Sequence, residues 1–340
     1  MHSQPPSRRP PTIDNVAKLA GVSSATVSRV INHSAPVIPA TLQKVQAAIE
    51  TLNYRPSAAA RILAQRKTDT LGLLMPEISE TFFIPLLRGI EQAASQAGFS
   101  LLIHTTSYGP KNNPFAMLGE HNTDGLLIFS ESLANEELAR LQRSGFPVVL
   151  IHQDTPEGLR IPGITIDNQG GAQSLVDHLI EQHSRRRIVH LRGPQSANDA
   201  LWREKGYRQS LAEHHIPVDP ALVLPGNFDT DTAQNTIRHL IQSGTAFDAI
   251  FSGDDSSALG VLAALREAGI RVPEDVSVVG FDDVDFASHV HPPLTTVHAP
   301  TEQVGERAVE QLLKLIAGEE VEPVTLLPVE LVIRKSCGCD

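Results

Sequence analysis

The sequence predicts an α/β protein with a small helical domain at its N-terminus and a larger core of parallel sheets. Residues 12–52 show helical periodicity with tight turns and no strand pattern. From Thr70 onward, short continuous apolar runs alternate with amphipathic helical segments, which indicates parallel strands covered by helices on both faces. About ten strands in the second part favour two sheets over one.

The charge of the chain is divided unevenly between these two parts. The 340 residues carry a net charge of −11, but residues 1–68 carry +7 and the remainder carries −18. A basic N-terminal part followed by an acidic remainder is expected when only the N-terminal part contacts nucleic-acid phosphates. No apolar run is long enough to span a membrane and no secretory pattern opens the chain, so we expect a cytoplasmic protein without a membrane partner.

The stretch 12–32 (TIDNVAKLAGVSSATVSRVIN) predicts two helices joined by a tight turn. Thr12 is a suitable N-cap for the first helix, Gly21 suits a left-handed helix end, and Ser23 can cap the second helix. The outward face of the second helix is small, polar and basic, and consists of Ser24, Ala25, Ser28, Arg29 and Asn32. Such a face fits the DNA major groove, where arginine can contact guanine. A solvated face on an ordinary helical hairpin is the alternative.

A third helix is predicted over residues 40–52, with Pro39 in its first turn. The small core of this domain should contain Val16, Val27, Val30, Val45 and Ile49. Residues 1–11 are rich in proline and basic, and we expect them to be disordered. The Ala-rich segment 57–64 is too short for a stable isolated helix. Its apolar Leu63 either packs onto the core or enters a minor-groove step of DNA.

The predicted strands of the core are 71–75, 100–104, 125–129, 147–151, 164–166, 188–191, 249–252 and 276–281. The predicted helices are 83–97, 170–181, 199–215, 230–243, 255–268 and 301–316. Ligands of such sheets bind outside the carboxyl ends of the strands. The loops there contain Phe82, Phe83, His152, Asp199, Arg203, Asp254 and Asp282. Aromatic faces beside charged groups suit a polyhydroxylated ligand, although Asp255 and Asp283 individually resemble helix N-caps.

The sequence lacks the common enzyme motifs, including a P-loop, a GxSxG elbow, HExxH and a strand-linked GxGxxG. We therefore predict no catalytic residues and no cofactor. Two cysteines, Cys337 and Cys339, lie in CGCD at the end of the chain. Two cysteines alone cannot form a disulfide framework or a four-ligand zinc site, so we expect a reduced, solvated tail and no metal.

From Thr12 onward the chain resembles the LacI/GalR family of bacterial transcription regulators, the lactose- and purine-repressor type. The resemblance rests on the stretch 12–32, the LNYRP and SAAARILA linker, VPEDVSVVGFDD and HPPLTTVHAP. It implies a helix-turn-helix headpiece, a hinge helix and a core similar to periplasmic sugar-binding proteins. Such a regulator works as a homodimer, or a higher oligomer, on a near-palindromic operator.

The resemblance also implies domain boundaries. The tail would be 1–11, the helix-turn-helix domain 12–56, the hinge helix and linker 57–69, and the core 70–340. The core would have two subdomains crossed three times by the chain. The N-subdomain would take in about 70–166 and 296–326, and the C-subdomain about 167–295 and 327–340.

Roles of individual residues follow by position. Ser24, Ala25 and Arg29 would read bases, and Leu63 would be the minor-groove wedge. Phosphate contacts would come from Thr12, Ser23, Thr26, Ser28, Asn32, Thr41 and Tyr54. Effector-pocket positions of the family match Phe82, Phe83, Arg203, Phe228 and Asp282, to which the strand-end loops add His152, Asp199 and Asp254.

The chain departs from its relatives at several positions. Ile38 stands where relatives usually have a serine that caps the third helix, His152 replaces a common Asp, and Gly253 replaces Asn. Ala197 and Asp199 occupy positions that carry Arg and Thr in the purine repressor, which disfavours a purine effector. The added carboxylate also disfavours a phosphorylated ligand, so we expect a neutral sugar or polyol.

The predicted function is a ligand-gated repressor of transcription. A soluble sugar-binding protein without DNA function is the alternative, but it would share only the core and would need no basic headpiece. An α/β enzyme with a DNA-binding head is a second alternative, for which the sequence offers no nucleophile paired with a base.

Overall fold

A computed structural model describes residues 11–32, 35–54, 67–106, 118–130 and 132–339. The chain forms two compact units, Met1–Thr68 (unit 1) and Asp69–Asp340 (unit 2). Most of the predicted tail at 1–11, most of the predicted hinge at 57–69, and Leu63 lie outside the described residues. Within the described ranges, no helix is long and apolar enough to cross a membrane.

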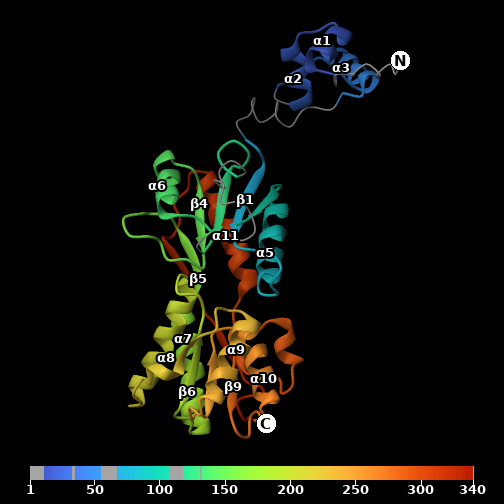
Figure 1. The fold of residues 1–340 in the computed structure, drawn as a ribbon. Helices are drawn as coiled ribbons and strands as arrows, with labels where there is room; N and C mark the ends of the chain where they lie inside the picture. Colours follow the sequence, from blue (N-terminus) through green and yellow to red (C-terminus); the bar gives the residue numbers. More distant parts are fainter. Residues whose placement is uncertain (1–10, 33–34, 55–66, 107–117, 131, 340) are drawn as a thin grey trace, which may run out of the picture. The chain divides into compact units, whose positions relative to one another are not determined.

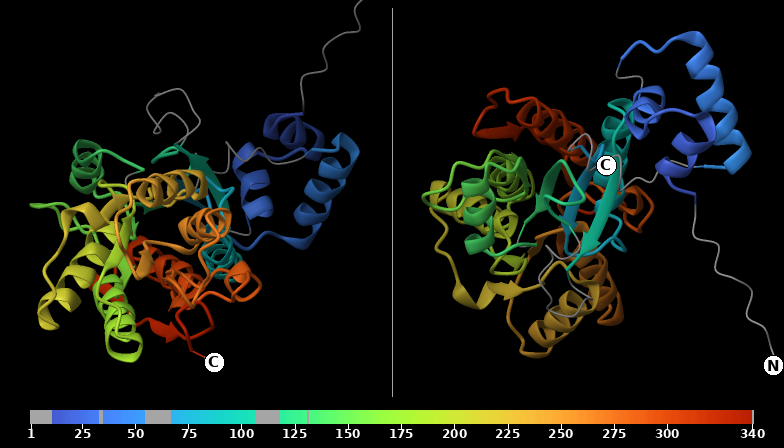
Figure 2. Two further views of the ribbon diagram at one scale, coloured as in Figure 1. Left: turned by 60° about the horizontal axis from the view of Figure 1, so that its bottom comes forward. Right: turned by 90° about the horizontal axis from the view of Figure 1, so that it is seen from above.

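Three helices pack around one another in unit 1 (Figure 2): α1 (Ile13–Ala20), α2 (Ser24–Asn32) and α3 (Pro39–Leu52). The predicted caps are confirmed. Thr12 accepts a hydrogen bond from the Asn15 amide, and Gly21 ends α1 at a φ of +67°. Ser23 Oγ accepts from the Thr26 amide at 3.2 Å, so a short, sharp turn separates α1 from α2.

The core of unit 1 is small and tightly closed. Val16, Val27 and Val45 are fully buried, and Val30 and Ile49 pack with them as predicted. Pro39 occupies the first turn of α3, as expected, whereas Ile38 before it makes no capping hydrogen bond and is 73% exposed. The start of α3 is therefore the least satisfied helix end of this unit, because its first amides lack a side-chain acceptor.

Unit 2 contains two parallel sheets (Figure 1). The first has the strand order β11-β5-β4-β3-β1-β2 and the second the order β7-β6-β8-β9. The strands of the first sheet are β1 (Thr70–Met75), β2 (Ser100–Thr105), β3 (Gly125–Phe129), β4 (Val148–Ile151), β5 (Gly163–Ile166) and β11 (Val324–Leu327). Those of the second are β6 (Ile188–Arg192), β7 (Val223–Pro225), β8 (Ala249–Ser252) and β9 (Ser277–Val279).

Helices cover both faces of each sheet, as the apolar strands predict. They are α5 (Phe83–Gln96), α6 (Asn135–Ser144), α7 (Asn168–His183), α8 (Asn198–Glu213), α9 (Thr230–Gln242), α10 (Asp255–Glu267) and α11 (Thr301–Ile316). In β3, Leu127 packs with α5 and α11, while Leu126 and Ile128 pack with α6 on the opposite face. Alternation of this kind buries every residue of β3.

The chain passes between the two sheets three times. It leaves the first sheet after β5, returns with α11, and crosses again after β11. Figure 1 shows α11, late in the sequence, beside α5 of the first half. A short antiparallel pair, β10 (Thr296–His298) with β12 (Glu330–Val332), accompanies the last two crossings. Isolated bridges join Thr295, just before β10, to Val279 of β9, and His298 of β10 to Asp282.

Several elements were not predicted. The strands β7, β10 and β12 have three residues each, too few for a periodic signal. The edge strand β11 alternates between exposed and half-buried side chains, unlike the continuous apolar runs of the central strands. The helix α6 buries only Leu138 and Leu141, so its apolar stripe is short, although Gly145 marks its end.

Candidate functional site

The outward face of α2 is a candidate nucleic-acid interface. Ala25 and Arg29 are exposed there, and Ser24 and Ser28 are half-buried. The Ser24 hydroxyl donates to Asp14 Oδ1 at 2.6 Å, which holds it against α1. Of the three residues predicted to read bases, Arg29 therefore presents the only long, charged donor on this face.

The predicted phosphate-contacting residues lie mainly at helix starts. Thr12 and Ser23 cap α1 and α2, and Ser23 Oγ also lies 2.9 Å from Thr26 Oγ1. Thr41 lies in the first turn of α3. Helix N-termini favour anions, because their free amides point outward. Tyr54 differs, since it is 8% exposed and belongs to the core of unit 1. Ser28 lies along α2, and the side chain of Asn32 is not described.

Unit 2 holds a cavity of about 360 Å³ at the carboxyl ends of its strands. All eight residues predicted for the effector pocket line it: Phe82, Phe83, His152, Asp199, Arg203, Phe228, Asp254 and Asp282. They follow strands of both sheets, so the cavity lies between the two halves of unit 2. Whether each of them contacts a ligand remains a prediction.

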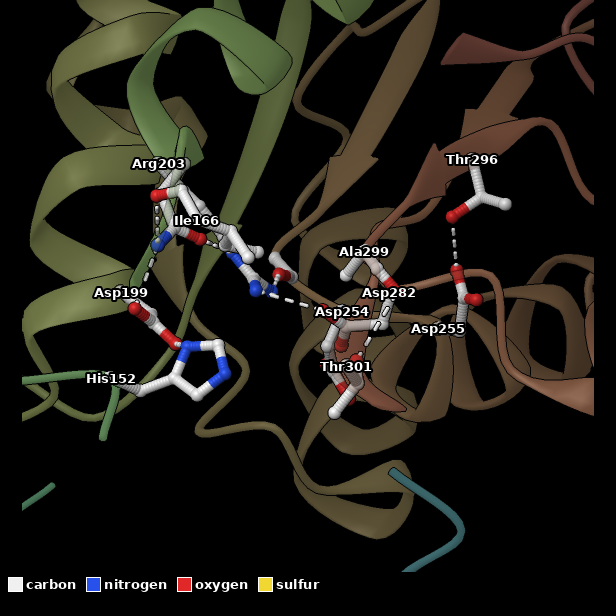
Figure 3. A network of polar contacts seen from close by, with 12 residues as sticks. His152, Ile166, Asp199, Arg203, Asp254, Asp255, Asp282, Thr296, Ala299 and Thr301 are labelled. Carbon is white, nitrogen blue, oxygen red and sulfur yellow. Dashed lines mark hydrogen bonds and ion pairs between the residues drawn. The ribbon is translucent and has the colours of Figure 1, made fainter. Parts of the chain in front are cut away.

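Arg203 is the centre of a buried polar network (Figure 3). Its guanidinium donates to Asp282 Oδ1 at 2.8 Å, to Asn168 Oδ1 at 2.9 Å and to the Gly253 carbonyl at 2.7 Å. The guanidinium carbon also lies 3.8 Å from the centroid of the Phe281 ring. These contacts lock the arginine in place, because each of its three nitrogens already has an acceptor.

A second polar pair lies next to this network, and its aspartate lies one helical turn earlier than Arg203 on α8. His152 Nδ1 is 2.8 Å from Asp199 Oδ2, and both side chains are buried. Asn168 Nδ2 donates to Asp199 Oδ1 at 2.7 Å, which joins this pair to the arginine network. Burial opposes ionisation of Asp199, but His152 and Arg203 outweigh it, so the pKa of Asp199 is lowered. The His152 ring packs against Phe82 and Phe129.

Three other carboxyl groups of the lining have raised pKa values. Burial raises the pKa of Asp282 to about 7, although Arg203 acts in the opposite direction. Burial raises the pKa of Glu80 to about 8, and a hydrogen bond and charge repulsion from Glu77 add to the shift. Burial likewise raises the pKa of Asp254. The cavity thus gathers acidic groups whose pKa values burial raises.

The assignment of N-caps from sequence was wrong at two positions. Asp254, not Asp255, caps α10, and its carboxylate accepts from the amides of Ser256 and Ser257. Asp255 is buried one residue later and accepts from Thr296 Oγ1 at 2.7 Å. Asp283 caps no helix but accepts from Arg334 at 2.6 Å and pairs with His298. Which of two neighbouring aspartates caps a helix depends on the tertiary contacts of each side chain, which the sequence does not show.

Four of the nine described residues other than glycine that have positive φ angles line the cavity. His152, Asn227, Phe228 and Asp282 all line it and have positive φ angles, of 54°, 55°, 58° and 107°. Residues other than glycine keep such conformations only where the surrounding structure holds them, and they concentrate at functional sites. This observation supports a ligand site independently of any sequence resemblance.

Sequence reasoning missed part of the lining. The additional residues include Glu77, Glu80, Thr106, Phe129, Ser130 and Asn227. Glu77 and Glu80 lie in a loop that the sequence singled out, and Ser130 directly follows a predicted strand, so the strand-end rule could have found them. Among the described residues, His152 Nε2 and Ser130 Oγ are buried without a hydrogen-bond partner. Such groups are stabilised if a ligand supplies the partner.

The C-terminal cysteines depart from expectation. Cys337 is fully buried rather than solvated, and Cys339 is half-buried. Both lie against His178 and His183 at the end of α7. The prediction of a solvated tail is therefore wrong, because the sequence does not show that the C-terminal segment packs against α7, which is far away in the chain.

Comparison with known proteins matches both units. Residues 12–57 match the family of bacterial regulatory proteins of the lacI type, and residues 176–337 match the periplasmic binding protein-like domain. The transcriptional regulator CelR of Thermobifida fusca is 38% identical over 97% of this chain and 99% of its own length. The transcriptional repressor PurR of Vibrio atlanticus is 36% identical over 92% of this chain and 93% of its own.

Solved structures agree with this relationship. A complex of the regulator CelR with cellobiose is 36% identical, covers 96% of this chain and 99% of its own, and superposes with a TM-score of 0.73. The lac repressor dimer bound to operator and the anti-inducer ONPF is 29% identical, covers 97% and 99%, and superposes with a TM-score of 0.84.

Proposed function

Because this chain belongs to the LacI family of bacterial transcription regulators, we propose that it binds operator DNA as a homodimer and that a neutral sugar controls this binding. On this proposal the protein acts in the cytoplasm, where bacterial DNA lies. The cavity binds its ligand and catalyses no reaction. The observation that carries the ligand assignment is the cavity between the two sheets, lined with aromatic rings and carboxyl groups.

On the DNA side, Arg29 reads a guanine from the exposed face of α2. Ala25 is short and suits contact with a thymine methyl group. Ser24 contributes less than its position suggests, because its hydroxyl is already bonded to Asp14. Thr12, Ser23, Thr26, Ser28, Asn32, Thr41 and Tyr54 hold phosphates on this proposal. Leu63, outside the described residues, is the proposed minor-groove wedge.

On the ligand side, the chemistry of the lining favours a neutral polyhydroxylated molecule. Phe82, Phe83 and Phe228 offer faces for the apolar side of a sugar ring. Asp199, Asp254, Asp282 and the two glutamates offer oxygens for sugar hydroxyls. Asp199, whose pKa is lowered, keeps a negative charge that opposes a phosphorylated ligand. Arg203 does not offset this charge for a ligand, since its guanidinium is already bound to Asp282. CelR, which is similar in sequence, has been solved with cellobiose.

On this proposal the ligand acts on DNA binding by closing the two halves of unit 2, because residues that follow strands of both sheets line the cavity. The result is a coupling free energy between the two sites, typically about 1–3 kcal/mol. Such coupling is reciprocal, so operator DNA has to change the affinity for sugar by the same factor. Equal sugar affinity with and without operator would contradict this mechanism.

Thermal unfolding of the full chain in the presence of candidate ligands tests the ligand class. We expect cellobiose or a related neutral sugar to raise the Tm, because a ligand of the folded state stabilises it by RT ln(1 + [L]/Kd). Glucose 6-phosphate and guanine serve as the anionic and purine comparisons. A Tm increase with guanine alone would replace the sugar proposal with a purine effector.

Arg29→Ala tests the DNA assignment. We expect a loss of about 1–3 kcal/mol confined to one base position, with relaxed preference there. Lys44→Ala removes the same charge from an exposed position of α3 and controls for the charge change. Selection of binding sequences from a random pool measures both. If the two variants select the same sequences as the parent chain, α2 is not the recognition helix.

A further inference from the structure

Two histidines and two cysteines meet at the end of α7, on the side of unit 2 away from the cavity lining. His178 and His183 come from α7, and Cys337 and Cys339 come from the C-terminal segment more than 150 residues later. One ligand atom from each of the four lies within 4.8 Å of the others. None of the four lines the cavity described above.

Three of these atoms are spaced like one face of a tetrahedral metal site, and Cys337 Sγ lies within 4.8 Å of all three. His178 Nε2 and His183 Nε2 are 3.3 Å apart, and Cys339 Sγ lies 3.6 Å and 3.4 Å from them. Zinc binds sulfur at about 2.3 Å and nitrogen at about 2.0–2.1 Å. A tetrahedron with these bond lengths has N···N edges of about 3.3–3.4 Å and N···S edges of about 3.5–3.6 Å. The observed distances match both kinds of edge.

The groups around the cluster hold its ligands in position. Cys337 is fully buried, Thr295 Oγ1 donates to its sulfur at 3.1 Å, and the sulfur lies 3.4 Å from the Arg334 carbonyl oxygen. Ser277 Oγ donates to the Cys337 carbonyl at 2.7 Å and fixes the backbone there. Gly338 between the cysteines has a φ of +115°, and a Cβ at this position would lie 3.1 Å from His183 Nδ1. The tight turn that brings both sulfurs to the histidines therefore requires glycine.

We propose that His178, His183, Cys337 and Cys339 bind one zinc ion that fastens the C-terminal segment to α7. Two thiolates and two imidazoles in a tetrahedron are the ligand set that zinc prefers. Four protein ligands leave no open coordination position, so the site is structural rather than catalytic. The ion would link two segments that no disulfide joins, because neither Cys337 nor Cys339 forms one.

Metal analysis of the full chain, prepared without a polyhistidine tag, is the direct test. We expect one zinc per chain by inductively coupled plasma mass spectrometry and a marked loss in Cys339→Ser and His178→Ala. His121→Ala, at an exposed position outside the cluster, is the matched control and should keep its zinc. Gly338→Ala should also lose zinc, although it removes no ligand. Chelation should lower the Tm of the parent chain but not that of Cys339→Ser.

Cobalt substitution of the parent chain gives a readout that does not depend on any variant folding. A tetrahedral site with two thiolates should show thiolate-to-cobalt charge transfer and intense visible d–d bands. Absence of both zinc and cobalt binding in the reduced parent chain would overturn the proposal. Zinc retained equally by Cys339→Ser and His178→Ala would also overturn it, as would a Cys337–Cys339 disulfide in the freshly isolated protein.

Discussion

Single side chains in unit 2 differ sharply in what their removal should cost. Arg203 and Arg208 lie on the same helix, α8, but Arg203 is buried in the cavity wall whereas Arg208 forms an exposed pair with Glu204. Removing one partner of a buried ion pair leaves the other charge without solvent or counter-charge, which costs much stability. Removing one partner of an exposed pair costs little, because water solvates the remaining charge.

Arg203→Met should therefore lower the free energy of unfolding of unit 2 by about 3–5 kcal/mol, because Asp282 and the Gly253 carbonyl lose their partner. Arg208→Met should change it by less than about 1 kcal/mol. The single tryptophan, Trp202, is on the same helix, so its fluorescence during urea unfolding reports both variants. Equal decreases in the free energy of unfolding in the two variants would contradict the buried network described for Arg203.

Glu80 makes the stability of unit 2 depend on pH. Its pKa rises from an ordinary 4.5 to about 8 in the folded chain, so between these values the folded chain binds more protons than the unfolded chain. Raising the pH through this window should therefore lower the free energy of unfolding. Glu80→Gln should flatten the decrease between about pH 5 and 8, as measured by urea unfolding.

The control for this experiment is Glu91→Gln, at an exposed position of α5, which should leave the pH dependence of the parent chain unchanged. Asp254 and Asp282 also have raised pKa values, so part of the decrease should persist in Glu80→Gln. A pH dependence identical in Glu80→Gln and the parent chain would show that Glu80 is ordinary in solution.

At the scale of elements, helix ends decide much of the local geometry. The α1 cap formed by Thr12 and Asn15 satisfies amides at its start, and Gly21 ends the helix in a turn that starts α2. The start of α3 lacks this support, because Ile38 has no side-chain acceptor. Pro39 compensates partly, since it carries no amide hydrogen and has a φ suited to the first turn.

Ile38→Ser should stabilise α3 by about 1 kcal/mol, because a serine there can accept from a free amide. Ile38→Ala removes the same exposed side chain without supplying an acceptor and is the matched control. Hydrogen exchange of peptides from α3 in the full chain measures the effect. Slower exchange is expected in the serine variant only, and equal exchange in both variants would contradict the capping explanation.

At the scale of the whole molecule, charge is separated along the chain. Residues 1–68 carry +7 and the remainder −18, so attraction to DNA belongs to the first unit and repulsion to the second. Neutral-sugar binding in unit 2 involves no release of ions, whereas each phosphate contact releases condensed counterions. The two binding activities should therefore respond differently to salt.

Operator affinity of the full chain should fall by a factor of about 1,000 or more when salt rises from about 50 to 200 mM. Over the same range, affinity for a neutral sugar that raises the Tm should change little, which makes it an internal control. Fluorescence anisotropy of labelled DNA and isothermal titration of the sugar measure the two. DNA binding that is insensitive to salt would be inconsistent with phosphate contacts from the basic unit.

The sequence by itself determined the helices and strands that depend on interactions between residues close together in the chain. Thr12, Gly21 and Ser23 act on amides within a few residues, so the helix pair of unit 1 could be predicted with its caps. The central strands of unit 2 could be predicted from their continuous apolar runs. The rule that ligands lie at the carboxyl ends of such strands identified seven of the eight predicted cavity residues, and Phe228 came from the family resemblance.

Only the tertiary structure decided which distant groups meet. That Asp254 caps α10 while Asp255 bonds to Thr296 depends on a segment some 40 residues later. The raised pKa of Glu80 depends on burial in the packed core. The meeting of His178 and His183 with Cys337 and Cys339 depends on how the chain returns after β11. Periodicity and capping act between neighbours in sequence, whereas these contacts exist only once the packed core has brought remote segments together.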